Sequence, residues 1–159
     1  MKYLQNLHTH STFCDGKNTP RETVESAVKQ GFKSIGFSGH SYMYYDTDYC
    51  MTKTGTEEYI AEINSLKKEY ADKIEIFLGV EADMYSAPDL PHGFDYKIGS
   101  LHFLLIDGEY VEIDRPSEDV EKVLTNISAK TDFYMQKNIM RNCQNFRLTE
   151  ILTLLAISI

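Results

Sequence analysis

The sequence has little of what several large protein classes require. Its three cysteines, Cys14, Cys50 and Cys143, are odd in number and form no CxxC pair. This argues against both a disulfide framework and a structural zinc knuckle. We find no N-terminal signal peptide and no apolar run of membrane-spanning length. The sequence therefore predicts a cytoplasmic protein without a membrane partner.

Basic residues are also scarce. Lysine and arginine number 16 against 24 aspartates and glutamates, and the formal net charge is −8. Broad binding to a phosphate backbone requires a basic face, so a nucleic-acid partner is not favoured. A small phosphorylated substrate is still compatible with this charge, because bound cations reverse the local sign.

The motifs of nucleotide binding and of serine hydrolases are missing as well. No P-loop and no dinucleotide glycine fingerprint occurs in the sequence. Ser38, Ser41 and Ser100 lie close in sequence to His40 or His102, but none has the context of a nucleophile elbow. With 159 residues, the chain has the length of one domain with a substantial core.

The pattern that remains alternates strands and helices. Thr19-Pro20-Arg21-Glu22 predicts a helix start, with threonine at the cap and proline at the first helical position, and Gly31 is its natural end. A second helix is expected from Thr56 to Tyr70 and a third from Glu118. Strands are predicted at 2–7, 34–38, 74–80 and 96–101, with a hairpin at 104–113 around Asp107-Gly108. This order indicates an α/β fold with a parallel sheet and outer helices.

Residues of types that can bind metals follow these strands. His8 and His10 come after the first strand and point to the same side if the chain is extended, with Asp15 in the next turn. His40, Glu81 and His102 end three further strands. Each residue alone is weak evidence, since a histidine near a strand end is more often an ordinary surface or core residue, as we interpret His92. Together, however, they lie where barrels of alternating strands and helices place their active sites.

Imidazole and carboxylate ligands suit zinc, manganese or iron rather than calcium. Glu81 could bridge two ions. Clustered divalent ions stabilise the charge that develops on a transferring phosphoryl group and make hydroxide available at neutral pH. The ligand set therefore predicts a metal-dependent hydrolase.

Four segments, HTHSTFCDG, GFSGH, GVEAD and GSLHF, resemble in order and spacing the PHP (polymerase and histidinol phosphatase) superfamily, and within it the monofunctional histidinol-phosphatases. The resemblance covers about residues 1–137. It implies a distorted (β/α)7 barrel resembling a TIM barrel, with a cluster of up to three divalent ions (zinc, manganese or iron). It also implies hydrolysis of L-histidinol phosphate, in histidine biosynthesis, by a metal-bound hydroxide, with no separate catalytic residue assigned.

The resemblance also distributes the ligands. It assigns His8, His10 and Glu81 to one metal and Glu81 and His102 to a second, so that Glu81 bridges. Asp15 and His40 would hold the third. Substrate-binding residues cannot be placed, because Arg115 is the only arginine between Arg21 and the C-terminal tail.

Two later motifs of this family, Gly-His-x-Asp and Asp-x-His, are missing from the chain. Permitted codons for residues 138–147, read two bases further on, encode Tyr-Tyr-Glu-Glu-Leu-Ser-Lys-Leu-Pro. In the same frame, residues 152–159 give Asp-Ile-Ile-Gly-His-Phe-Asp. We therefore interpret residues 1–137 as the N-terminal part of an incomplete barrel and 138–159 as an out-of-frame, non-native tail. The alternative is a genuine divergent helix or strand.

Three functions follow as hypotheses. The first is a histidinol-phosphatase whose truncated chain is impaired in turnover. The second is a phosphoesterase of the same superfamily that acts on nucleotides or nucleic-acid ends. The third is a non-catalytic remnant that kept its metal ligands.

Overall fold

The computed structural model describes residues 4–45, 48–85, 90–106 and 108–113. The chain divides into two compact units, Met1–Ile98 and Gly99–Ile159, and each is described by itself. The predicted helix at Glu118 and the proposed out-of-frame tail, with its boundary at residue 137, lie outside the described residues. No helix among the described residues is long and apolar enough to cross a membrane.

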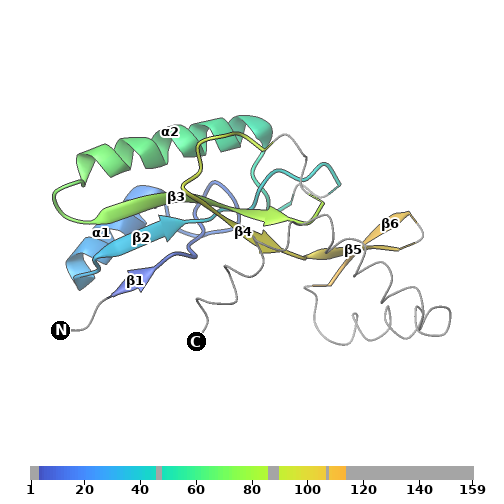
Figure 1. Ribbon diagram of the computed structural model, residues 1–159, viewed down its shortest axis with the longest axis horizontal. Helices are drawn as coiled ribbons and strands as arrows, with labels where there is room; N and C mark the ends of the chain where they lie inside the picture. Colours follow the sequence, from blue (N-terminus) through green and yellow to red (C-terminus); the bar gives the residue numbers. More distant parts are fainter. Residues whose placement is uncertain (1–3, 46–47, 86–89, 107, 114–159) are drawn as a thin grey trace. The chain divides into compact units, whose positions relative to one another are not determined.

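A four-stranded sheet in the order β1-β2-β3-β4 organises the first unit (Figure 1). Its strands are β1 (Gln5–Asn6), β2 (Ser34–Phe37), β3 (Glu75–Asp83) and β4 (Tyr96–Ser100), the last of which runs into the second unit. β1 pairs with β2, and β2 with β3, in parallel. The predicted parallel α/β sheet is therefore confirmed.

Helix α1 (Pro20–Gln30) begins and ends where the sequence predicts. The Thr19 side chain accepts a hydrogen bond from the Glu22 backbone, and the Glu22 side chain accepts one from the Thr19 backbone, which completes a capping box. Gly31 ends the helix in the left-handed conformation, with φ of 80°. Val24 and Ala27 are buried against the sheet.

Helix α2 (Lys53–Glu69) starts three residues before the predicted Thr56. The reason is the cap: the Thr52 side chain accepts a hydrogen bond from the backbone of Gly55. Ile63 and Leu66 are buried as the periodicity indicates, and Tyr59 is buried with them.

The strands also differ from prediction at their ends. Among the described residues β1 is limited to Gln5–Asn6, so His8 and His10 lie in the loop that follows it. β3 continues to Asp83, so Glu81 lies inside the strand. The sequence predicts instead that Glu81 follows the end of the strand. The extension arises because His40, just past β2, forms a parallel bridge with Glu81.

The two faces of the sheet have different roles. Both helices pack on one face, where Ile35 and Phe37 of β2 join Ile76, Leu78 and Val80 of β3 in a single hydrophobic core. Because side chains alternate along a strand, Gly36, Gly79 and Glu81 belong to the opposite face. We call this opposite face the inner face.

Tyr96 covers the two glycines of the inner face. A Cβ atom on Gly79 would lie 2.2 Å from Tyr96 Cζ, and one on Gly36 would lie 2.4 Å from Tyr96 Oη. The Tyr96 hydroxyl donates to the carbonyl of Leu7 at 2.6 Å and lies 3.2 Å from the carbonyl of Phe37. Only glycine at positions 36 and 79 lets the ring lie this close to the sheet.

The second unit contains the predicted hairpin. β5 (Phe103–Ile106) and β6 (Glu109–Glu112) pair antiparallel, with Ile106 opposite Glu109. Gly108 in the connecting turn has φ of 89°, a value that glycine adopts readily.

Candidate metal centre

The loop after β1 carries the first three predicted ligands. It turns tightly on Ser11, whose carbonyl accepts hydrogen bonds from the backbones of Cys14 and Gly16. A Cβ atom on Gly16 would lie 2.3 Å from the backbone nitrogen of Ser11, so this close approach requires glycine. The turn brings Asp15 back to His10, whose Nδ1 lies 2.7 Å from Asp15 Oδ1.

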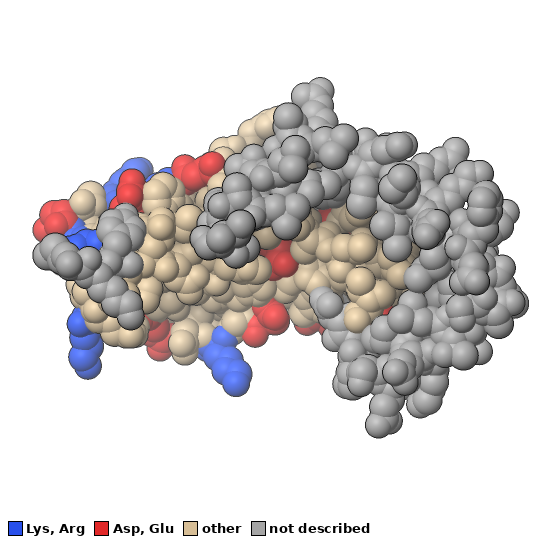
Figure 2. Space-filling view, turned by 60° about the horizontal axis from the view of Figure 1, so that its bottom comes forward, with Lys and Arg blue, Asp and Glu red and all other residues tan. Residues whose placement is uncertain are grey.

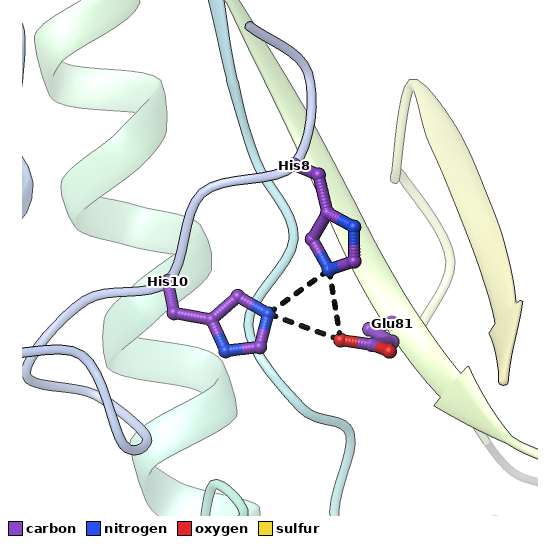
Figure 3. A group of neighbouring side chains, drawn as sticks. All are labelled: His8, His10 and Glu81. Carbon is purple, nitrogen blue, oxygen red and sulfur yellow. Dashed lines mark hydrogen bonds and ion pairs between the residues drawn. The ribbon is translucent and has the colours of Figure 1, made fainter. Parts of the chain in front are cut away.

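His8, His10 and Glu81 form a compact group at the carboxyl end of β3 (Figure 3). Their donor atoms define a triangle: His8 Nε2 lies 3.2 Å from His10 Nε2, and Glu81 Oε2 lies 3.1 Å from His8 Nε2 and 3.0 Å from His10 Nε2. The Glu81 side chain is 7% exposed and that of His8 is 52% exposed. The group is therefore anchored in the sheet and open on one side.

His10, Asp15 and His40 form a second group that shares His10 with the first. Asp15 Oδ2 lies 3.7 Å from His40 Nε2, and the rings of His10 and His40 meet edge to face at 4.4 Å. His40 also approaches the first group, with Nδ1 3.5 Å from Glu81 Oε2. Five of the six predicted ligands therefore lie together in the first unit.

The sixth predicted ligand, His102, belongs to the second unit. It follows β4, as the sequence indicates, and its Nδ1 lies 3.2 Å from Ser100 Oγ. Its role as a ligand stays a prediction. His92, which we interpret as a structural or surface residue, is exposed.

The backbone holds the ligands from β2 and β3 in register. The Glu81 backbone donates to Gly39 and accepts from Ser41, at 3.1 and 2.8 Å. Tyr49 packs edge to face against the His40 ring at 4.8 Å. The spacing of these ligands is therefore set by the sheet and by packing.

The ionisable side chains around His10 shift one another's pKa values. Hydrogen bonds with Cys14 and Glu81 raise the pKa of His10 to about 11, against an opposing effect of burial. Burial would raise the pKa of Asp15 and of Cys14, but in each case the hydrogen bond with His10 contributes to a net lowering. The carboxylates of Asp15 and Glu81 lie against the two ring nitrogens of His10, and this negative charge favours a cation at this position.

The donor set fits a transition-metal ion. Imidazole nitrogens and carboxylate oxygens are the ligands of zinc, manganese and iron sites. Donors about 2.0–2.1 Å from one tetrahedral zinc lie about 3.3 Å from each other, close to the sides of the triangle formed by His8, His10 and Glu81. Asp15 contacts the other ring nitrogen of His10, the position from which carboxylates orient metal-binding histidines.

Sequence reasoning missed two residues that shape this site. Cys14 contacts His10, and it lies inside the HTHSTFCDG segment, yet its spacing alone gives it no function. Tyr96 lies far along the chain and carries no ligand chemistry, so only its contacts reveal that it supports the loop that carries His8 and His10.

Known proteins resemble most of this chain in sequence. A family model described as the PHP domain matches residues 6–143. The chain belongs to the PHP domain family. The histidinol-phosphatase of Bacillus subtilis is 31% identical over 148 residues, which cover 81% of this chain and 55% of that protein. The chain spans about half the length of the curated relatives it matches.

Two solved PHP structures resemble the fold. The first, described by its authors as a proposed histidinol phosphatase from Listeria monocytogenes, has a TM-score of 0.60 at 24% identity and covers 74% of this chain and 52% of its own. The second is histidinol phosphate phosphatase from Lactococcus lactis, complexed with zinc, L-histidinol and phosphate. It has a TM-score of 0.51 at 27% identity and covers 76% and 49%. The likeness confirms the prediction of an incomplete barrel of the PHP type.

Proposed function

We propose that this chain forms the N-terminal part of a metal-dependent phosphomonoesterase that hydrolyses L-histidinol phosphate to L-histidinol and phosphate. The observation that carries the proposal is the triangle of His8, His10 and Glu81 at the carboxyl end of a parallel sheet. The relative from Lactococcus lactis, which binds zinc, L-histidinol and phosphate, supports the choice of substrate. A cytoplasmic location remains a prediction.

The proposed ligands are those expected from the sequence. His8, His10 and Glu81 would hold one ion, Asp15 and His40 another, and Glu81 with His102 a third. Bound divalent ions neutralise the oxygens of a phosphoryl group and lower the pKa of water. The protein would supply the positions: β3 fixes Glu81, and Asp15 orients His10 through Nδ1.

The test measures phosphate release from L-histidinol phosphate by the 159-residue chain after loading with zinc, manganese or iron. Because turnover by this chain is expected to be impaired, zinc binding is measured alongside by calorimetry. Glu81→Gln removes a ligand charge and should abolish turnover and weaken zinc binding. His92→Gln changes an exposed histidine outside both groups and serves as the matched control.

The outcomes separate the three candidate functions. Metal-dependent release from L-histidinol phosphate that is lost in Glu81→Gln supports the proposal. Faster hydrolysis of nucleotides or nucleic-acid ends than of L-histidinol phosphate, in a substrate panel, would support the second candidate function. Zinc binding without turnover of any phosphate ester would favour the non-catalytic role.

Charge on the face shown in Figure 2 does not favour the nucleic-acid substrate. On the face shown in Figure 2, the lysine and arginine side chains of the described residues stand apart from one another, with acidic side chains among them. Binding along a phosphate backbone relies on basic residues clustered on one face.

We further propose that the coding frame changes near Lys137, so that residues 138–159 are not native to the enzyme. Sequencing the coding DNA through the Lys137 codon tests this directly. An additional A that opens a frame running into Gly-His-x-Asp and Asp-x-His would support the proposal. A frame that ends at Ile159 without this shifted reading would refute it.

A further inference from the structure

His40 lies at the base of the loop formed by residues 41–50. The loop begins at Ser41, whose backbone donates to the carbonyl of Glu81 at 2.8 Å. It ends before Met51, whose backbone donates to the carbonyl of His40 at 3.1 Å. The loop therefore leaves and returns at the same ligand, and the hydrogen bonds at its two ends fix the backbone of His40 beside β3.

The described residues of this loop pack together above its base. Met43 is fully buried, and the Cys50 thiol lies 3.9 Å from the Met43 carbonyl. Tyr49 packs edge to face against the His40 ring, with the two centroids 4.8 Å apart. A displacement of the loop would move a ring that contacts the imidazole. The position of the loop thus helps to set the orientation of the His40 side chain.

A buried carboxylate on β3 holds the middle of the loop. Asp83 follows Glu81 by two positions, so both side chains lie on the inner face of the sheet. Asp83 Oδ1 accepts a hydrogen bond of 2.6 Å from the Tyr45 hydroxyl and one of 2.9 Å from the Tyr85 backbone. Asp83 is 3% exposed, and a carboxylate buried to this extent requires such donors. Short hydrogen bonds to carboxylates are among the stronger ones, so this contact is a firm anchor.

We propose that Asp83 and Tyr45 are positioning residues for the metal centre and that they act through His40. The backbone contact at Glu81 fixes the main chain of His40, and the contact between Asp83 and Tyr45 fixes the loop that packs against its ring. β3 therefore carries one ligand, Glu81, together with the anchor for another. This arrangement maintains the 3.5 Å between His40 Nδ1 and Glu81 Oε2. The inference rests on the proposed function, in which His40 is a metal ligand.

The experiment is a double-mutant cycle in which zinc binding to the 159-residue chain is measured by calorimetry. Tyr45→Phe keeps the ring and removes the hydroxyl, and it should weaken zinc binding about tenfold, as is typical when a group that orients a metal ligand is lost. In a chain that already carries His40→Gln, the same change should alter zinc affinity by less than about twofold, because no imidazole remains to be positioned. Tyr42→Phe is the matched control, since it removes a hydroxyl from the same loop and its ring lies 5.2 Å from the Lys53 ammonium.

A second pair of variants tests the carboxylate itself. Asp83→Asn keeps an oxygen that accepts from the Tyr45 hydroxyl, whereas Asp83→Ala removes it. The Asn variant should therefore bind zinc more tightly than the Ala variant, and equal affinities would contradict the inference. Thermal unfolding of the zinc-free chains verifies that each variant is folded at the temperature of the titration.

Two results of the cycle would overturn the inference. One is an unchanged zinc affinity in Tyr45→Phe. The other is an equal loss of affinity with and without His40, which a contact that only stabilises the fold would produce. If His40→Gln weakens zinc binding and Tyr45→Phe does not, the positioning role fails and the metal centre stands. Zinc binding that is insensitive to His40→Gln would contradict both.

Discussion

The hydroxyl of Tyr96 donates a hydrogen bond of 2.6 Å to the carbonyl of Leu7, the residue that precedes His8. The same hydroxyl lies 3.2 Å from the carbonyl of Phe37, at the end of β2. A single side chain from β4 therefore connects the loop of His8 and His10 to the neighbouring strand.

Tyr96→Phe should cost about 1–3 kcal/mol of stability, because the carbonyls of Leu7 and Phe37 lose a donor. It should also weaken zinc binding severalfold, since the loop that carries His8 and His10 loses its anchor. Urea unfolding and zinc calorimetry check the two effects. Tyr42→Phe serves as the control, and an unchanged zinc affinity in Tyr96→Phe would contradict the anchoring role.

Gly79→Ala should destabilise the chain by about 3 kcal/mol, because the added methyl group would lie 2.2 Å from Tyr96 Cζ. Chemical denaturation of the single variant measures the loss. The double variant Gly79→Ala with Tyr96→Leu should recover part of it, since the smaller side chain leaves room over β3. Strictly additive losses would show that the two residues do not clash.

Zinc should stabilise the chain against heat. A ligand that binds only the folded state at a hundred times its dissociation constant adds about 2.7 kcal/mol. His10 belongs to both ligand groups, so His10→Gln should remove most of this gain, whereas His92→Gln should retain it. Melting curves with and without a chelator test this, and an equal zinc shift in His10→Gln would contradict the ligand role.

Alkaline pH should unfold the chain. Burial raises the pKa of Tyr59 and of Tyr96 far above the ordinary value near 10. Above pH of about 10 the unfolded tyrosines lose protons that the folded ones keep, so stability falls by about 1.4 kcal/mol per pH unit for each residue. Below that pH both states are protonated and the contribution is fully present.

Equilibrium unfolding between neutral and alkaline pH measures this slope. Tyr59→Phe, which removes the hydroxyl that donates to the Gly79 carbonyl, should make the slope shallower. A slope identical to that of the wild type would contradict the assignment.

Local signals in the sequence predict helix α1 accurately, because Thr19, Pro20, Glu22 and Gly31 fix its ends through contacts between near neighbours. The predicted start of α2 is wrong by three residues, because the cap of this helix lacks such a local signal. Its cap, Thr52, is followed at the third helical position by Gly55 and not by glutamate, so no capping box marks it. Periodicity alone placed the start at Thr56.

For the metal centre, residue type and strand ends predict that His8, His10 and Glu81 lie at one edge of the sheet, and the family resemblance assigns these three to one metal. The parallel sheet brings the carboxyl ends of β1, β2 and β3 to one edge, so sequence order translates into proximity. The supporting contacts of Tyr96 and Tyr45 were not predictable. The Tyr96 contacts require that Gly36 and Gly79 have no side chain. The Tyr45 contact requires the turn that returns segment 41–45 to Asp83.

Alternation along β3 separates two kinds of evolutionary constraint. Ile76, Leu78 and Val80 pack in the core under the helices, while Glu81 lies on the other face with the candidate metal ligands. A metal-binding residue can therefore be exchanged for another donor without disturbing the packing that folds the sheet. Such a strand can acquire new reactions while its stability is inherited unchanged.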